Sequence, residues 1–111
     1  MAKIISQYNF TDKREQYNLL NTPAGKMRDH VGERLEVKAW AFIERENRDT
    51  GECTKVFMVK TGDGELIGTS SKSFIDGVEN FLSVFDPEEL TEFESAKGVS
   101  RGGRDYLIFR A

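Results

Sequence analysis

The feature that most constrains the fold of this chain is an alternating stretch near its middle, residues 34–44. Because successive side chains of a β-strand point to opposite faces, this stretch predicts one strand with two different faces. The first face is aliphatic and comprises Leu35, Val37, Ala39, Ala41 and Ile43. The second face comprises Glu36, Lys38, Trp40, Phe42 and Glu44. Large aromatic rings beside a cation, opposite a complete aliphatic face, predict that the second face is a surface for flat ligands.

Four more strands are predicted after this first one, which itself extends to about residue 46. They span residues 54–61, 65–71, 93–99 and 105–110. The turn between the first two of them contains Gly62 and Gly64, and glycine accepts the positive φ that hairpin turns require. The two final strands are joined by a second glycine-containing turn, residues 100–104, which predicts another hairpin.

A single amphipathic helix is predicted between the third and fourth strands. The apolar residues Phe74, Val78, Phe81 and Phe85 recur at spacings of four, three and four. This period matches one face of an α-helix, and it predicts that the face packs on the sheet. Ser71 or Ser73 is expected to cap the start of the helix, and the Asp-Pro pair at 86–87 is expected to end it.

The order strand, strand, strand, helix, strand, strand is that of an OB-fold, a mainly β structure in which five strands form a Greek-key barrel. Residues 26–111 are therefore assigned to one OB-fold nucleic-acid-binding domain, with the helix closing one end of the barrel. Residues 1–25 are interpreted as a partly helical N-terminal arm. In the arm, Thr11 or Asp12 is expected to cap a helix that Pro23 prevents from continuing.

Charge is segregated along the second half of the chain. The 111 residues suffice for one domain with a hydrophobic core, and their formal net charge of -3 excludes a uniformly basic nucleic-acid binder. However, residues 86–94 carry five acidic and no basic residues, whereas residues 97–111 carry four basic residues and one acidic residue. This pattern is compatible with one positive groove, and equally with two solvated faces.

Several function classes lack the residues that they need. His30 is the only histidine and Cys53 the only cysteine, so one chain can form neither a histidine or thiolate metal cluster nor an internal disulfide. Without a recognisable set of nucleophile, base and metal ligands, the chain is predicted not to be an enzyme and to use no cofactor. No apolar run reaches the roughly 20 residues that span a bilayer, and the first residues are too polar for a signal peptide. A cytoplasmic protein without membrane contact is therefore expected.

The remaining pattern favours binding of a single-stranded nucleic acid. Such strands stack their bases on aromatic side chains, at roughly 1–3 kcal/mol per base, beside a positive groove for the phosphates. The candidate stacking residues are Trp40, Phe42, Phe57 and Tyr106. The candidate phosphate contacts are Lys38, Lys55, Lys60, Lys72, Arg101 and Arg104. A place in the hydrophobic core is the alternative for each aromatic residue, and a slip of one residue in the first strand would move Trp40 there.

Four segments of the chain resemble a known family. They are residues 31–40, 59–65, 68–74 and 100–106, with the sequences VGERLEVKAW, VKTGDGE, GTSSKSF and SRGGRDY. Over about residues 27–111 the chain resembles small single-stranded DNA-binding proteins encoded by tailed bacteriophages. The resemblance implies an OB-fold that coats single-stranded DNA in the host cytoplasm during phage DNA replication or recombination. It further implies binding without sequence specificity or catalysis, with replication or recombination proteins as possible partners.

One departure limits what the resemblance implies. Cellular bacterial single-stranded DNA-binding proteins end in a disordered acidic tail that recruits partners, whereas this chain ends at residues 109–111 within an expected strand. Neither recruitment through a tail nor the tetramer of those cellular proteins is therefore carried over. The oligomeric state is left open between monomer and dimer.

Two other non-catalytic functions remain open at this point. The first is a protein-interaction module, in which the acidic run and the aromatic N-terminal arm engage another protein; the negative net charge favours it. The second is an RNA-binding barrel of the cold-shock type, which also uses surface aromatic residues. The sequence does not decide between DNA and RNA, because it does not show whether a 2′-hydroxyl is recognised.

Overall fold

A computed structural model describes residues 2–21, 25–46, 49–99, 101–103 and 105–111. The fold is mainly β, with one curled mixed sheet that forms a half-barrel and two α-helices. The strands are β1 (Ala2–Tyr8), β2 (Gly25–Lys26), β3 (Arg34–Glu46), β4 (Cys53–Thr61), β5 (Leu66–Thr69), β6 (Glu92–Val99) and β7 (Asp105–Arg110). The helices are α1 (Lys13–Asn21) and α2 (Lys72–Val84), with short 3-10 turns η1 (Met27–His30) and η2 (Pro87–Glu89).

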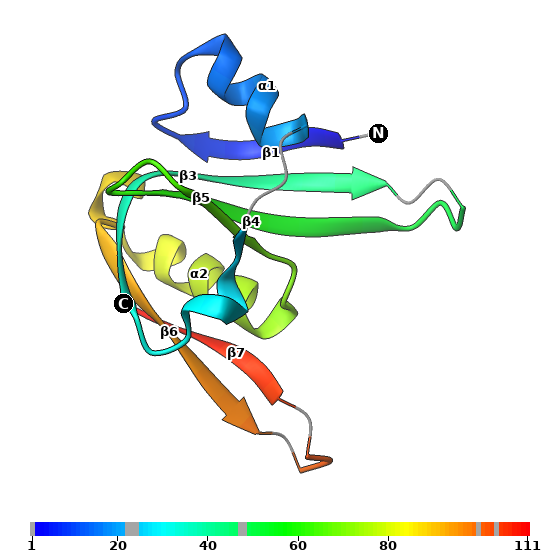
Figure 1. Ribbon diagram of the computed structural model, residues 1–111, viewed down its shortest axis with the longest axis vertical. Coiled ribbons are helices and arrows are strands. Elements are labelled where there is room, and N and C mark those ends of the chain that lie inside the picture. Colours follow the sequence, from blue (N-terminus) through cyan, green and yellow to red (C-terminus); the bar gives the residue numbers. More distant parts are fainter. Residues whose placement is uncertain (1, 22–24, 47–48, 100, 104) are drawn as a thin grey trace.

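Strand β3 is the centre of the sheet. The order of strands is β2-β5-β4-β3-β6-β7, and β1 pairs with β3 outside this path. Strand β3 therefore pairs with β4 along most of its length, with β6 near its start and with β1 toward its end. All these pairs are antiparallel, whereas the short strand β2 runs parallel to β5. In Figure 1 the β3–β4 and β6–β7 hairpins project in different directions from the sheet, with α2 between them.

The sequence-based order of elements after residue 26 is confirmed. The five expected strands correspond to β3, β4, β5, β6 and β7, and α2 lies between the third and fourth of them. Of the two glycines in the β4–β5 turn, Gly64 has the expected positive φ, 87°, and Gly62 does not. Ser71 occupies the N-cap position of α2 but makes no capping hydrogen bond through its side chain, and the helix ends before the Asp-Pro pair. The sheet also contains two strands, β1 and β2, that the pattern of the sequence did not predict.

A β-bulge in β3 corrects the expected assignment of its two faces. The register with β4 shifts between Val37 and Ala39, so Lys38 is an extra residue on β3. Before the bulge, Leu35 and Val37 pack against the core beneath α2. After it, Trp40 and Phe42 lie in that same core, whereas Ala39, Ala41 and Ile43 belong to a second one. One extra residue thus turns the aromatic face inward, because it exchanges the two faces of the strand.

The N-terminal residues form a structural layer rather than a separate arm. Strand β1 pairs with residues 40–45 of β3, and α1 covers the face of the sheet that carries Ala39 and Ala41. The side chains of Phe10 and Leu19 are fully buried in this second core. The expected cap of α1 is Asp12, whose Oδ1 accepts a hydrogen bond of 2.8 Å from the backbone N–H of Arg14.

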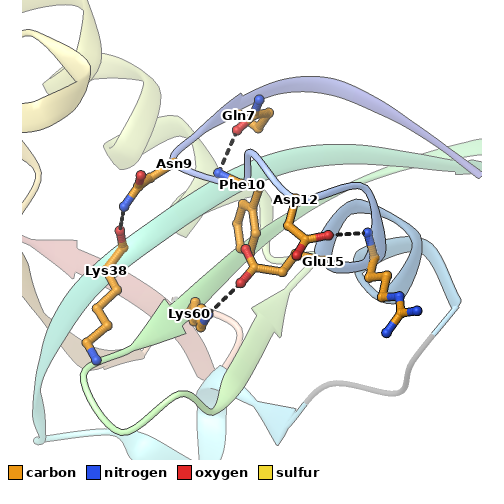
Figure 2. Close-up of polar contacts among 8 residues, drawn as sticks. Gln7, Asn9, Phe10, Asp12, Glu15, Lys38 and Lys60 are labelled. Carbon is orange, nitrogen blue, oxygen red and sulfur yellow. Dashed lines mark hydrogen bonds and ion pairs between the residues drawn. The ribbon is translucent and has the colours of Figure 1, made fainter.

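Polar contacts fix this N-terminal layer to β3 and β4 (Figure 2). Asn9 lies in the turn after β1 with a φ of 68°, a conformation that asparagine tolerates better than most residues. Its Nδ2 donates a hydrogen bond of 2.9 Å to the backbone oxygen of Lys38, the bulged residue. On α1, Glu15 accepts a hydrogen bond of 2.9 Å from Nζ of Lys60 on β4. The layer therefore contacts the sheet through apolar burial and through specific polar pairs.

The core beneath α2 borders one buried hydroxyl that lacks a hydrogen-bond partner among the described residues. Ser95 lies on β6 between Phe93 and Lys97, it is fully buried, and its Oγ has no hydrogen bond there. A buried hydroxyl without a hydrogen bond costs roughly 1–3 kcal/mol.

We expect the substitution Ser95→Ala to raise the free energy of unfolding by about 1 kcal/mol, because it removes this unpaired group and leaves only a small void. For a domain of this size the melting temperature should rise by roughly 4 °C. Thermal unfolding followed by circular dichroism measures the shift. Ser83→Ala on the exposed side of α2 is the control, and a Ser95→Ala protein that melts below the wild type would contradict the expectation.

Candidate nucleic-acid interface

Three of the four candidate stacking residues lie in the core and not on a surface, which corrects their expected exposure. Trp40 is 4% exposed, Phe42 is 5% exposed and Phe57 is fully buried. The rings of Phe42 and Phe57 have centroids 5.0 Å apart, and Trp40 Nε1 donates a hydrogen bond of 3.3 Å to the backbone oxygen of Pro87. Their burial follows from the Lys38 bulge and from the packing of α2 over this face.

Two candidate phosphate contacts already have carboxylate partners. Lys55 Nζ lies 2.8 Å from Glu79 on α2 and 5.2 Å from the ring centroid of Phe42. Lys60 Nζ lies 2.9 Å from Glu15 on α1. Both ammonium groups therefore serve to fix a helix to the sheet, and a phosphate would have to replace a carboxylate to reach them.

The other candidates are spread over the molecule. Lys38 is exposed at the bulge of β3, Lys72 is exposed at the first position of α2, and Arg101 is exposed in the turn between β6 and β7. Arg104 lies outside the residues that the structure describes. Tyr106, on β7, is 40% exposed and is the only candidate stacking residue with a substantial free surface. The nine candidates that the structure describes thus do not form one continuous surface.

A groove lies where the half-barrel is open, between β5 and β7, and we call it the β5–β7 groove. It has a volume of about 830 Å³. Its lining residues are Lys26, Met27, Arg28, Val31, Gly68, Thr69, Ser70, Ser71, Lys97, Asp105, Tyr106 and Leu107. These residues come from β2 and η1, from the junction of β5 and α2, and from β6 and β7. Ser73 Oγ donates a hydrogen bond of 2.8 Å to the backbone oxygen of Leu107, which joins α2 to β7 beside the groove.

Tyr106 is held in a defined orientation at one wall of this groove. It pairs with Gly98 across the β6–β7 ladder. A Cβ atom placed on Gly98 would lie 2.5 Å from Cζ of Tyr106, so the tyrosine ring covers the space that a side chain at Gly98 would fill. The ring is therefore fixed on one side by a glycine backbone and remains partly open to solvent. A preorganised, half-exposed aromatic ring is suited to stacking on a planar ligand.

The charge of the groove is positive although the net charge of the chain is negative. Lys26, Arg28 and Lys97 contribute cations, and Asp105 is the only carboxylate among the lining residues. Asp105 pairs with Lys97 at 2.9 Å, and both side chains are more than half exposed. Within the described parts of the chain, Lys26 and Arg28 take part in no ion pair. The groove therefore offers two unneutralised cations, one exchangeable pair and the hydroxyls of residues 69–71.

Of the residues that line this groove, only Tyr106 is predicted from the sequence to contact a ligand. Lys26 and Arg28 precede the first expected strand and were not considered as ligands. The sequence predicts that the hydroxyl residues 69–71 end a strand and cap a helix, and does not predict that they contact a ligand. Lys26 and Arg28, two cations at alternating positions a few residues before the first expected strand, are the signal that could have drawn attention to the groove. Their proximity to β7 depends on contacts between distant parts of the chain.

The described histidine, cysteine and acidic side chains include no metal-ligand cluster and no activated thiol. Among the described residues, no group of three or more histidine, cysteine or acidic side chains is arranged to hold a metal ion. A hydrogen bond to Glu44 raises the pKa of the Cys53 thiol, and burial adds to the shift. The same hydrogen bond, together with Lys3, lowers the pKa of Glu44. A raised thiol pKa reduces the thiolate fraction, which is opposite to what a cysteine nucleophile requires.

Neither α1 nor α2, nor any other helix in the described parts of the chain, is long and apolar enough to cross a membrane. Comparisons with protein-family models, curated proteins and solved structures gave no match to this chain.

Proposed function

We propose that the protein binds single-stranded DNA without sequence specificity, with the β5–β7 groove as the path of the backbone and Tyr106 as a stacking platform. The proposed role is to coat and protect single strands during phage DNA replication or recombination, as the family resemblance implies. No catalytic step and no cofactor are part of the proposal. The groove replaces the buried aromatic residues Trp40, Phe42 and Phe57 as the binding surface.

The arrangement of the strands supports an OB-type barrel. Strand β3 pairs with both β4 and β6, β5 follows β4, and α2 lies between β5 and β6. This connectivity is compatible with a five-stranded Greek-key barrel, a fold in which the second and third strands and the adjacent loops commonly bind oligonucleotides. In the present chain the layer of β1 and α1 covers one face of β3 and β4. That covering favours the open side between β5 and β7 as the binding surface.

The single observation that carries the proposal is the position of Tyr106 beside unneutralised cations. Its ring lies over Gly98, it is partly exposed, and it lines the same groove as Lys26 and Arg28. A base has a planar face that can stack on a fixed ring, and the phosphates on either side of that base need cations. Both requirements are met within one groove of about 830 Å³.

The direct test measures the affinity for a fluorescein-labelled oligo-dT by anisotropy. We expect Tyr106→Ala to weaken binding by roughly 5- to 150-fold, since a stacked base is worth about 1–3 kcal/mol. Tyr106→Phe retains the ring and should bind within about threefold of the wild type. Emission from Trp40 is unsuited to this measurement because the residue is buried, but it does report whether each variant is folded.

The matched control is Tyr17→Ala, which removes the exposed tyrosine of α1, far from the lining of the groove. Its affinity should equal that of the wild type. If Tyr106→Ala and Tyr17→Ala bind equally well, or if the wild type does not bind oligo-dT, the proposal is wrong. Competition with oligo-U of the same length tests the cold-shock alternative, which requires RNA to displace DNA.

A second prediction concerns salt. Neutralising each phosphate of a single strand contributes about 0.7 to the negative slope of log affinity against log salt concentration, so the three cations of the groove predict a slope of about -2. The double substitution Lys26→Gln, Arg28→Gln should reduce the slope to about -0.7. The control is Lys13→Gln on α1, which should leave the slope unchanged. An affinity that does not depend on salt would exclude phosphate contacts in the groove.

A further inference from the structure

The end of α2 carries an exposed apolar surface next to acidic residues. Val84 is 77% exposed and Phe85 is 45% exposed, and the ring of Phe85 stacks on Phe81 with centroids 4.4 Å apart. Residues 86, 88 and 89, which follow directly, are all acidic. We call this surface, residues 84, 85, 86, 88 and 89, the acidic knob. Among the exposed large hydrophobic residues of the described chain, Val84 and Phe85 are the only two that are adjacent in sequence.

The acidic knob is held in a defined conformation. The backbone N–H of Phe85 donates to the oxygen of Phe81, which closes the last turn of α2. Asp86 and Glu89 form a capping box around η2, in which the backbone N–H of Asp86 donates to Glu89 Oε2 at 2.7 Å. Pro87 further restricts the backbone. A surface that is rigid before it binds loses less conformational entropy on association.

The opposite end of β6 carries the complementary chemistry. Val99 is 65% exposed at the last position of β6, and the exposed Arg101 follows in the turn. The turn sequence 100–104 contains two arginines and no acid. We call Val99 and Arg101 the basic tip. The eight residues of β6 separate the knob from the tip by roughly 25 Å at the rise of a strand. Figure 1 shows η2 and the tip of the β6–β7 hairpin at opposite ends of this strand.

We propose that the acidic knob of one copy of this chain docks on the basic tip of a second copy. The knob combines Val84 and Phe85 with three acidic residues. The tip combines Val99 and Arg101 with the neighbouring Lys97–Asp105 pair, so the net charges of the two surfaces are opposite. Because they lie at opposite ends of β6, they cannot meet within one molecule. The contact is heterologous, and heterologous contacts propagate into open head-to-tail arrays instead of closing a symmetric dimer.

The contact is small, so it is expected to be weak in free solution. A stable interface buries about 1,200 Å² or more, well beyond what two apolar and a few charged side chains provide. Two copies on one DNA strand would be held near each other at an effective concentration in the millimolar range. The weak contact would then favour contiguous coating of the strand. This consequence rests on the proposed function, whereas the self-association itself does not.

The test is analytical ultracentrifugation of the full chain without DNA. The mean mass of the wild type should rise with protein concentration at low salt, and the rise should disappear at high salt because the charge attraction is screened. Val84→Ser removes a mostly exposed side chain, so the protein stays folded, and it should weaken the association seen at low salt. A wild type that remains monomeric at every concentration at low salt would overturn the proposal.

Charge reversal identifies the two partners. Glu88→Lys gives a copy with a less acidic knob and an unchanged tip, and Arg101→Glu gives a less basic tip and an unchanged knob. Each variant alone should associate at least about tenfold more weakly than the wild type. An equimolar mixture should recover association into dimers, because the unaltered knob of the Arg101→Glu protein then meets the unaltered tip of the Glu88→Lys protein. If the mixture associates no better than the variants alone, the contact between knob and tip does not exist.

A short oligo-dT that accommodates one protein separates this result from the proposed function. Glu88→Lys should bind the short oligonucleotide as the wild type does, but it should lose the preference of the wild type for long oligonucleotides. If the wild type does not bind the short oligonucleotide, DNA binding is refuted, whereas the self-association measured without DNA is unaffected.

Discussion

Replacing Phe57 by alanine is expected to lower the free energy of unfolding by about 3–5 kcal/mol, the range for truncating a buried phenylalanine. Phe57 is fully buried, and its ring contacts Phe42 and Phe74 with centroids 5.0 Å and 6.2 Å away. Truncation would therefore leave a cavity between β3, β4 and α2. Since domains of this size are stable by about 5–15 kcal/mol, the loss should shift the urea midpoint substantially. Emission from Trp40, the only tryptophan, follows the transition.

The same substitution distinguishes a core residue from a surface stacking residue. An exposed aromatic residue changes stability by no more than about 0.5 kcal/mol when it is truncated, which is the expectation for the control Tyr17→Ala, whose side chain is 66% exposed. Phe57→Leu keeps most of the volume and should cost less than Phe57→Ala. A Phe57→Ala protein as stable as Tyr17→Ala would mean that the ring lies on the surface.

Truncation of Leu19 to alanine is the second substitution with a large expected effect, a loss of about 2–5 kcal/mol. Leu19 lies on α1 and is fully buried in the core shared with Ala41, Ile43 and Met58. If α1 were part of a detached arm, the substitution would be nearly silent. Chemical unfolding measured by circular dichroism and by Trp40 emission should give the same lowered midpoint, because β3 carries side chains of both cores.

Asn18→Ala is the matched control for Leu19→Ala, since Asn18 is the preceding residue on the same helix and is exposed. Alanine has a higher helix propensity than asparagine, so this control should be neutral or slightly stabilising. Circular dichroism and Trp40 emission could instead give separate midpoints in Leu19→Ala. The N-terminal layer would then unfold independently of the half-barrel, contrary to the expectation.

The elements with local signals could be predicted from the sequence. The period of Phe74, Val78 and Phe81 predicts α2, and the glycine at position 64 predicts the turn between β4 and β5. Strict alternation in the sequence of β7 places Tyr106, Ile108 and Arg110 on one face of the strand. The β6–β7 register agrees, because no bulge interrupts that ladder. In each of these cases a residue type or a period acts over a few positions.

The faces of β3 could not be predicted, because the sequence carries no mark of the bulge. Lys38 is neither glycine nor proline, and alternation simply continues through it. Only the pairing with β4 and the polar contact of Asn9 with the Lys38 backbone show that an extra residue is accommodated there. Strand β1 could not be predicted either, because it also contains an irregularity. Its register with β3 shifts between Ile4 and Ser6, so its apolar residues do not alternate.

The groove was unpredictable for a different physical reason. Its lining residues come from η1, from the segment that joins β5 to α2 and from β7, which lie up to about 80 residues apart in the chain. Charge counts along the sequence detected the basic C-terminal region, but they did not show that Lys97 would pair with Asp105. They also did not show that Glu15 and Glu79 would neutralise two of the candidate lysines. Such partners depend on which distant segments the fold brings together.

The shared position of β3 has a consequence for how the molecule opens. Trp40 and Phe42 anchor this strand in one core, and Ala41 and Ile43 anchor it in the other. No partial opening can release the middle of β3 unless both layers separate, so its amide hydrogens should exchange with solvent only through global unfolding. The strand that holds the two halves together would thus be the last part of the protein to become accessible.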